Sequence, residues 1–275
     1  MAIIAITQHL GTHGAELASL TAERLGYRLL TSEQLVAATS RKYDVPSSEL
    51  AVVDERRSNF WTRFKTDTGR FVAFFRSVAL NEMAQDRLVT IGRSVAQVLP
   101  DCGCGLRVRL TGTFSRRAAV VKEQEGCSTM ALAEARVRDY DREVRARIQS
   151  LFNTDIDDPA NYDLVLNVFG TRLAATAAVL ELLAEEADRA VQPADWRRMR
   201  NAALAAAIRA ELIRHPKLAN APLKVQCSDG AAQVSGLGLV SPWNELVSEL
   251  VRRVDGVKSV EVVNQNLPPD PWQTY

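Results

Sequence analysis

A short turn near the start of the chain has residue types and spacing that suit phosphate binding. Residues 8–17 read QHLGTHGAEL, between an apolar run (residues 2–6) and a helical pattern (residues 14–25). A strand, a glycine turn and a helix direct backbone N–H groups and the positive end of the helix dipole at one anion. Residues of the turn that could contact nucleotide phosphates are Gly11, Thr12, His13 and Gly14.

The cation that completes most phosphate loops is missing from this turn. A full loop adds a lysine for the outer phosphates and a Ser or Thr for magnesium. Ala15 and Glu16 stand at those places. The spacing alone therefore leaves two interpretations open, a phosphate site made of backbone groups and a plain tight turn.

Arginines later in the chain could supply positive charge to a phosphoryl group. Arg93 follows a buried strand (residues 87–91), so we expect it at the carboxyl edge of a sheet, where ligands of open α/β folds bind. Four more arginines lie on two helical stretches, residues 115–125 and 128–152: Arg116, Arg117, Arg142 and Arg145. Phosphoryl transfer depends on positioning and on charge stabilisation, which such side chains provide. The alternative for these four is a solvated helix face.

Two other groups of residues could suggest metal binding, but we expect neither group to bind a metal ion. Asp155, Asp157 and Asp158 lie in TDIDDPAN, where Asp158 before a proline is typical of a capped turn. Cys102 and Cys104 have no second Cys/His pair at a supporting spacing, so free reduced thiols are expected. The sequence predicts no metal site.

The elements that must position these residues alternate between strand and helix. Strands are expected at residues 2–6, 27–30, 87–91, 106–111 and 162–167, and helices at 14–25, 32–43, 54–86, 115–125, 128–152 and 171–190. This alternation predicts an α/β fold with a parallel sheet covered by helices on both faces, over residues 1–192. A linker is expected at residues 193–200.

The last part of the chain has a different pattern. Residues 201–267 predict a small α+β domain with the order α-β-β-α-β, in which Asp229-Gly230 marks a hairpin turn. Residues 268–275 are expected to form a tail. The chain should therefore contain two domains.

Composition limits the classes of function. The 275 residues carry a formal net charge of +1, which argues against a general nucleic-acid-binding protein. Basic and aromatic residues interleave at residues 55–77, but a buried helical stripe explains the spacing of Phe60, Phe64, Phe71 and Phe75. No run approaches the roughly 18 apolar residues of a membrane span, and the start lacks a basic signal region. We expect a cytoplasmic protein.

The first 190 residues resemble the cytidylate kinase-like family. The start matches a glycine loop of the form Y-G-S-G-G-R-E-I-A followed by L-G-Y, and residues 89–93 (VTIGR) resemble the strand end V-I-V-G-R. Residues 114–123 (FSRRAAVVKE) are similar to a helix with paired arginines. Residues 155–167 (DIDDPANYDLVLN) match D-W-G-D-P-x-N-Y-D-L-V-L-N, the most specific of the four motifs.

This resemblance implies a P-loop nucleoside monophosphate kinase fold with an acceptor-binding helical insert and an arginine-bearing lid. It implies ATP with Mg²⁺ as donor, a CMP-like acceptor, phosphate binding at Arg93, and transition-state contacts from Arg142 and Arg145. The chain departs from the family at Ala15, where Lys or Arg is usual, and at Ser94, where cytidylate kinases carry aspartate. These departures put activity in doubt, so whether the chain is an enzyme stays open.

Residues 201–267 resemble a BON domain (named for bacterial OsmY and nodulation proteins). The match rests on Ile208-Arg209, on Val225 before Asp229-Gly230, and on Val254-Asp-Gly-Val257. The resemblance implies a recognition or assembly module that contacts phospholipid, a small ligand or a second copy of the chain. Two functions remain: a nucleotide kinase, or a non-catalytic nucleotide sensor or scaffold that acts through the BON-like domain.

Overall fold

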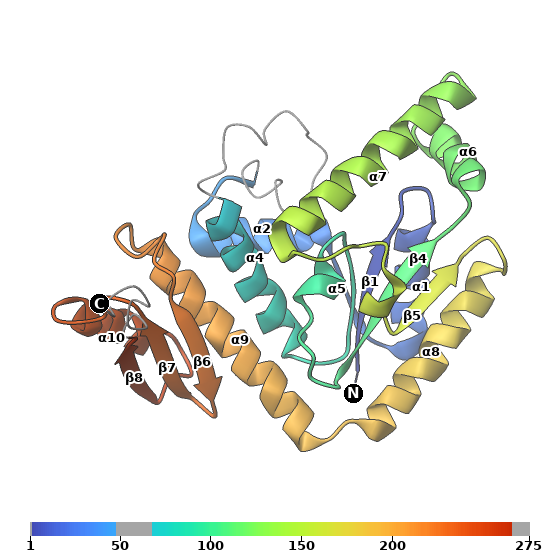
Figure 1. The fold of residues 1–275 in the computed structure, drawn as a ribbon. Coiled ribbons are helices and arrows are strands. Elements are labelled where there is room, and N and C mark those ends of the chain that lie inside the picture. Colours follow the sequence, from blue (N-terminus) through green and yellow to red (C-terminus); the bar gives the residue numbers. More distant parts are fainter. Residues whose placement is uncertain (1, 48–67, 266–275) are drawn as a thin grey trace, which may run out of the picture.

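A five-stranded parallel sheet forms the centre of the N-terminal part of the computed structural model, which describes residues 2–47 and 68–265 (Figure 1). Its strands are β1 (Ile3–Gln8), β2 (Arg28–Thr31), β3 (Leu88–Ile91), β4 (Gly105–Thr111) and β5 (Leu164–Asn167), in the order β2-β3-β1-β4-β5. All four pairings are parallel. The predicted α/β class is confirmed.

Each face of this sheet is covered by helices because the side chains of its inner strands are apolar on both sides. Ile4 and Ile6 of β1 pack with α1 (Gly14–Leu25) and α8 (Leu173–Ala190). Ile3 and Ala5 point the other way. They belong to a core that includes α2 (Ser32–Tyr43), α4 (Thr68–Met83) and the short α5 (Val95–Val98). A strand buried on both faces reads as a continuous apolar run, as residues 2–6 do.

Two helices extend beyond one end of the sheet (Figure 1). They are α6 (Phe114–Gln124) and α7 (Met130–Phe152), which pack together through Ala118, Val121, Ala133 and Val137. Both helices were expected, and they carry Arg116, Arg117, Arg142 and Arg145. That they form a lid stays a prediction.

The aromatic residues of α4 are core residues. Phe71 and Phe75 are buried, as predicted, and the ring of Phe74 stacks on Tyr43 with 4.2 Å between centroids. Phe60, Phe64 and the expected start of this helix at residue 54 lie outside the described residues, as does the tail at residues 268–275. Among the described residues, no helix is long and apolar enough to cross a membrane.

The C-terminal part is a three-stranded mixed sheet with two helices. The elements follow one another as α9 (Pro193–Arg214), β6 (Lys224–Ser228), β7 (Ala231–Gly236), α10 (Trp243–Arg252) and β8 (Ser259–Asn264). Strands β6 and β7 are antiparallel, whereas β7 and β8 are parallel. This is the predicted α-β-β-α-β order.

Residues 193–200 form the first part of α9 and not the linker that the sequence suggested. Pro193 occupies the first turn, where its missing N–H costs nothing, and Asp195 accepts the backbone N–H of Gln192 at 2.6 Å. Helix α9 then serves both parts of the molecule. Met199 and Ala203 join the core beside α4, while Ile208 and Leu212 join the core of the C-terminal sheet.

Candidate functional site

The phosphate-loop turn connects β1 to α1 through two left-handed residues. Gly11 has a φ of 78°, and a Cβ there would lie 2.5 Å from the carbonyl oxygen of Arg117. His13, which precedes α1, has a φ of 52° and makes no side-chain capping bond. Left-handed backbone is uncommon for a residue with a side chain and is found often at functional sites. Glycine is required at position 11 for both conformation and space.

The inside of the turn is organised by Gln8 and Thr12. The Thr12 hydroxyl lies 2.7 Å from the carbonyl oxygen of His9 and 3.2 Å from the Gln8 Oε1. That same Oε1 lies against Gly14, where an added Cβ would be only 1.9 Å away. In the part of the chain that the structure describes, the N–H groups of residues 14–16 donate to no backbone carbonyl oxygen. Free N–H groups at the start of a 12-residue helix provide a place for an anion.

A small cavity of about 130 Å³ lies beside the turn. Ala15 lines it, together with Ser32 and Glu33 at the start of α2, Gly92 and Arg93 at the end of β3, and Tyr140 of α7. The structure thus places Arg93 after the end of β3, at the carboxyl edge of the sheet, in a cavity that the first turn of α1 also lines. Its role in phosphate binding stays a prediction. Arg93 donates from Nε to the Tyr140 hydroxyl at 2.8 Å, and its guanidinium lies 4.8 Å from the ring centroid. Ser94, the next residue, is fully buried and does not line this cavity.

The four lid arginines do not converge on one point. Arg116 donates to the Phe169 carbonyl oxygen at 2.8 Å. Arg142 pairs with Asp139 at 2.7 Å on the exposed side of α7. Only Arg117 and Arg145, among the four, line a common cavity. The solvated-face interpretation therefore fits Arg142 well.

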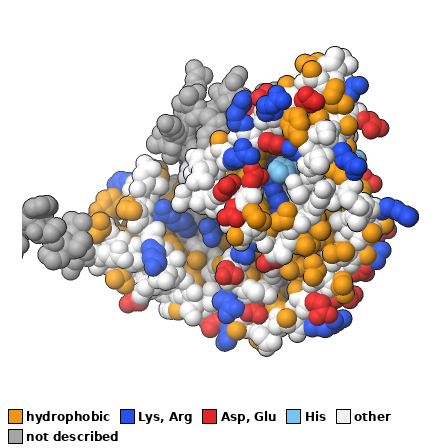
Figure 2. Space-filling view, turned by 45° about the vertical axis from the view of Figure 1, so that its right-hand side comes forward, with side chains coloured by type: hydrophobic (Ala, Val, Ile, Leu, Met, Phe, Trp, Pro, Cys, Tyr) orange, Lys and Arg blue, Asp and Glu red, His pale blue; other side chains and the backbone are white. Residues whose placement is uncertain are grey.

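Arg117 and Arg145 belong to a group of charged residues that we call the arginine cluster: His9, Arg109, Arg117, Asp141, Arg145 and Asp157. It surrounds a cavity of about 330 Å³ between β4, β5, α7 and the turn at residues 155–159. Arg117 binds Asp141 through two hydrogen bonds of 2.9 and 2.6 Å. Asp157 accepts from Arg109 at 3.0 Å and from Arg145 Nε at 2.8 Å. Figure 2 shows a histidine on this side of the molecule among acidic and basic side chains.

His9 connects the turn to the arginine cluster. Its Nε2 lies 3.2 Å from Asp157 Oδ1, and its Nδ1 lies 3.2 Å from the Thr111 hydroxyl. Because a carboxylate only accepts, Nε2 carries the proton and Nδ1 accepts from Thr111. Burial lowers the pKa of His9 below its usual range, against the opposing effect of Asp157. The hydrogen bond from His9, together with Arg145 and Arg109, lowers the pKa of Asp157.

Arg109, like His9 and Asp141, is a residue of this cluster that the sequence did not point to. Only 4% of it is exposed, and its Nε and Nη1 have no acceptor among the described residues. Buried donors without a partner are costly, and they are common where an ion or a water binds. A signal was present in the sequence, since LRVRLT has Arg at alternating positions of an inner strand. Both faces of an inner strand are covered, so an arginine there is expected to be buried and to need a partner.

The turn before β5 is capped as predicted. Asp158 accepts the N–H of Ala160 at 2.9 Å and precedes a short 3₁₀ turn (Pro159–Asn161). Asp155 accepts the N–H of Asp157 at 3.0 Å. These bonds hold the Asp157 carboxylate toward the arginines. Asp157 is thus an ion-pair partner in this structure.

Comparison with known proteins places the N-terminal part in a family. Residues 3–169 match the model of the cytidylate kinase-like family. An uncharacterized protein from Eubacterium ventriosum ATCC 27560 is similar in structure, with a TM-score of 0.53 and 15% identity over 67% of this chain and 98% of its own. A shikimate kinase from Bacteroides thetaiotaomicron has a TM-score of 0.42 and 13% identity, over 67% of this chain and 98% of its own. No curated protein matches.

Proposed function

The chain belongs to the cytidylate kinase-like family, and we propose that it binds nucleotide phosphates but has lost efficient phosphoryl transfer. The observation that carries this proposal is Ala15, which lines the cavity opposite Arg93 where a cation is needed. Backbone N–H groups at the start of α1 would hold the phosphates, with Arg93 as the nearest cation. The protein would then act as a nucleotide sensor or scaffold.

The energetics of phosphoryl transfer support this choice. Each cation that contacts the transferring group contributes on the order of 10²–10⁵ in rate, because charge builds up on oxygens in a site that excludes water. Arg117 and Arg145 are bound to aspartates, and Arg116 is bound to a carbonyl oxygen. An incoming phosphate would have to compete with these acceptors. The site therefore favours binding over turnover.

A second candidate is phosphoryl transfer from ATP to a nucleoside monophosphate such as CMP. It is favoured by Arg93, which lies at the carboxyl edge of the sheet between the turn and the start of α2. The described residues contain no group of three metal-ligating side chains. Mg²⁺ would therefore be held by nucleotide phosphates and water, and we assign no step to it.

The C-terminal α-β-β-α-β unit is part of this proposal as a recognition module of the BON type. Its hairpin turn at Asp229-Gly230 and its Val254–Val257 segment carry the resemblance. Contact with a phospholipid, a small ligand or a second copy of the chain would allow nucleotide binding to be reported to a partner. A homo-oligomer is one form that this could take.

Calorimetry separates the two candidates. Purified protein is titrated with ATP, ADP and CMP in the presence of magnesium, and each nucleotide that binds is assayed for phosphoryl transfer. We expect binding with turnover near the background rate. Arg93→Ala should weaken binding about tenfold, since a charge-assisted hydrogen bond contributes about 1.5–3 kcal/mol. Arg41→Ala, at an exposed position of α2 outside the cavity, is the matched control and should bind normally.

Two results would change the proposal. Clear turnover that Arg93→Ala abolishes would establish the transferase instead of the sensor. If no nucleotide binds at millimolar concentration, both candidates are excluded.

A further inference from the structure

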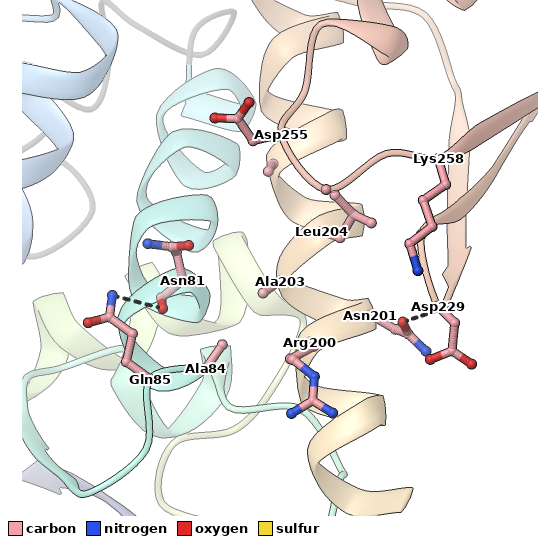
Figure 3. A pocket seen from close by; sticks show the side chains of 13 residues that line it. Asn81, Ala84, Gln85, Arg200, Asn201, Ala203, Leu204, Asp229, Asp255 and Lys258 are labelled. Carbon is pink, nitrogen blue, oxygen red and sulfur yellow. Dashed lines mark hydrogen bonds between the residues drawn. The ribbon is translucent and has the colours of Figure 1, made fainter.

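A cavity beside α9 lies at the junction of the two parts of the molecule (Figure 3). It measures about 490 Å³, within the range of roughly 300–1,000 Å³ typical of small-molecule sites. We call it the junction cleft. Its lining comes from the end of α4 (Asn81) and the turn after it (Ala84, Gln85), from α9 (Arg200, Asn201, Ala203, Leu204, Ala207), and from two turns of the C-terminal unit (Asp229, Gly230, Asp255, Gly256, Lys258).

Four charged side chains of the junction cleft have no ion-pair partner among the described residues: Arg200, Asp229, Asp255 and Lys258. On the same helix, Arg198 pairs with Asp195 and Arg214 with Glu211. Charges of both signs are therefore available to a molecule that enters the cleft. Arg200 and Asp255 lie at opposite ends of the cleft, and Lys258 extends toward Asp229 (Figure 3).

Polar groups and small apolar side chains complete the lining. Asn201 accepts the backbone N–H of Asp229 at 3.0 Å through Oδ1, which leaves its NH₂ group as a donor. The Lys258 side chain extends toward Asn201 and Asp229 (Figure 3). Ala84, Ala203, Leu204 and Ala207 add apolar side chains to the lining, against which an apolar part of a ligand can pack.

Two glycines hold the turns of the cleft close together. Gly230 and Gly256 each have a φ of 93°, and Lys258 donates its N–H to the Gly230 carbonyl oxygen at 2.8 Å. A Cβ on Gly230 would lie 2.9 Å from the carbonyl oxygen of Gly256 and from the Lys258 side chain. The position of Lys258 thus depends on backbone packing, although its end is exposed.

We propose that the junction cleft binds a small organic phosphate that carries hydroxyl groups, as sugar phosphates and nucleotides do. The phosphate lies toward Arg200 and Lys258, since guanidinium and ammonium groups are the usual partners of phosphate oxygens. Hydroxyl groups donate to the carboxylates of Asp229 and Asp255. The ligand joins α4 to the C-terminal unit, so its binding stabilises one arrangement of the two parts.

Calorimetry with the full chain tests this with three probes: ribose 5-phosphate, CMP and inorganic phosphate. We expect Lys258→Met to weaken binding of the organic phosphates by about tenfold or more. Lys224→Met, at an exposed position of β6 outside the cleft, should leave it unchanged. Asp255→Asn should weaken binding of ribose 5-phosphate and leave binding of inorganic phosphate unchanged, because inorganic phosphate bound at Arg200 and Lys258 has no sugar hydroxyl that reaches Asp255.

The variants also separate this cleft from the phosphate loop. Binding of ribose 5-phosphate that Arg93→Ala preserves and Lys258→Met weakens supports the cleft, whatever the loop does. Preference for CMP over ribose 5-phosphate would identify a nucleotide as the ligand, and the reverse would identify a sugar phosphate. The proposal is overturned if no probe binds at millimolar concentration, or if Lys258→Met binds like the wild type while its melting temperature without ligand is unchanged.

Discussion

The arginine cluster and the junction cleft contain similar side chains but compensate their charges differently. In the cluster, Asp157 binds Arg109 and Arg145, and Asp141 binds Arg117. In the cleft, no ion pair joins Arg200, Asp229, Asp255 or Lys258 to a described residue. The first arrangement stabilises the fold at the expense of ligand access. The second leaves unpaired charged side chains that a ligand can contact. On this comparison, the proposed ligand meets less competition from protein carboxylates in the junction cleft than in the arginine cluster.

The largest expected effect is the loss of the central acid of the cluster. Asp157→Ala would leave Arg109 buried without its carboxylate, and breaking such a pair destabilises a protein by about 3–5 kcal/mol. Because Asp157 is partly exposed, we expect about 3 kcal/mol in the free energy of unfolding, measured by urea denaturation.

Asp139→Ala is the control for that variant. Asp139 and its partner Arg142 are both exposed, so this change should cost less than about 0.5 kcal/mol. If the two variants are equally stable, the cluster does not stabilise the fold, and the contrast with the cleft is lost.

The next effect restores the missing cation to the phosphate loop. Ala15→Lys adds an ammonium group at the first turn of α1, in the cavity that Arg93 lines. We expect the affinity for ATP, measured by calorimetry, to rise about tenfold, because the lysine adds charge-assisted hydrogen bonds to phosphate oxygens. Ala15→Met is the matched control of similar length without charge. Equal affinities in the two variants would mean that the turn does not hold phosphates.

The smallest effect is a dependence of stability on pH that comes from His9. Its pKa is lowered in the folded protein, so below about pH 6.5 the unfolded chain binds more protons and folding becomes less favourable as the pH falls. Asp157, whose pKa is also lowered, adds a further loss below about pH 4. In His9→Gln, urea midpoints between pH 7 and pH 5 should fall less than in the wild type. An identical slope would show that His9 is not the titrating group.

The fold was predictable from the sequence to the extent that local signals mark its elements. Helices α1 and α2 lie at their expected residues, and in the structure local signals mark their ends: Gly26 ends α1, and the Thr31–Gln34 capping box begins α2. The start of α9 was missed because a linker was expected at residues 193–200, although proline is favoured at the first turn of a helix.

The candidate site was predictable only where its residues are close in the sequence. The turn and the position of Arg93 follow from the order of strand, glycine and helix. The partners of Arg117 and Arg145 do not, since Asp141 and Asp157 reach them through the packing of α6, α7 and the turn before β5. Arg109 was predicted only as a strand residue, because nothing close to it in the sequence shows that residues of α7 and of the turn before β5 surround its guanidinium group.

The double role of α9 has a consequence for how the chain is made. Met199, Ala203 and Ile213 complete the core beside α4, which includes Phe74 and Phe75. When residues 1–190 have emerged from the ribosome, every strand of the larger sheet has therefore emerged, but the helix that covers those phenylalanines has not. The nascent chain must keep that surface soluble until about 20 more residues emerge, so a fragment cut before Pro193 should aggregate.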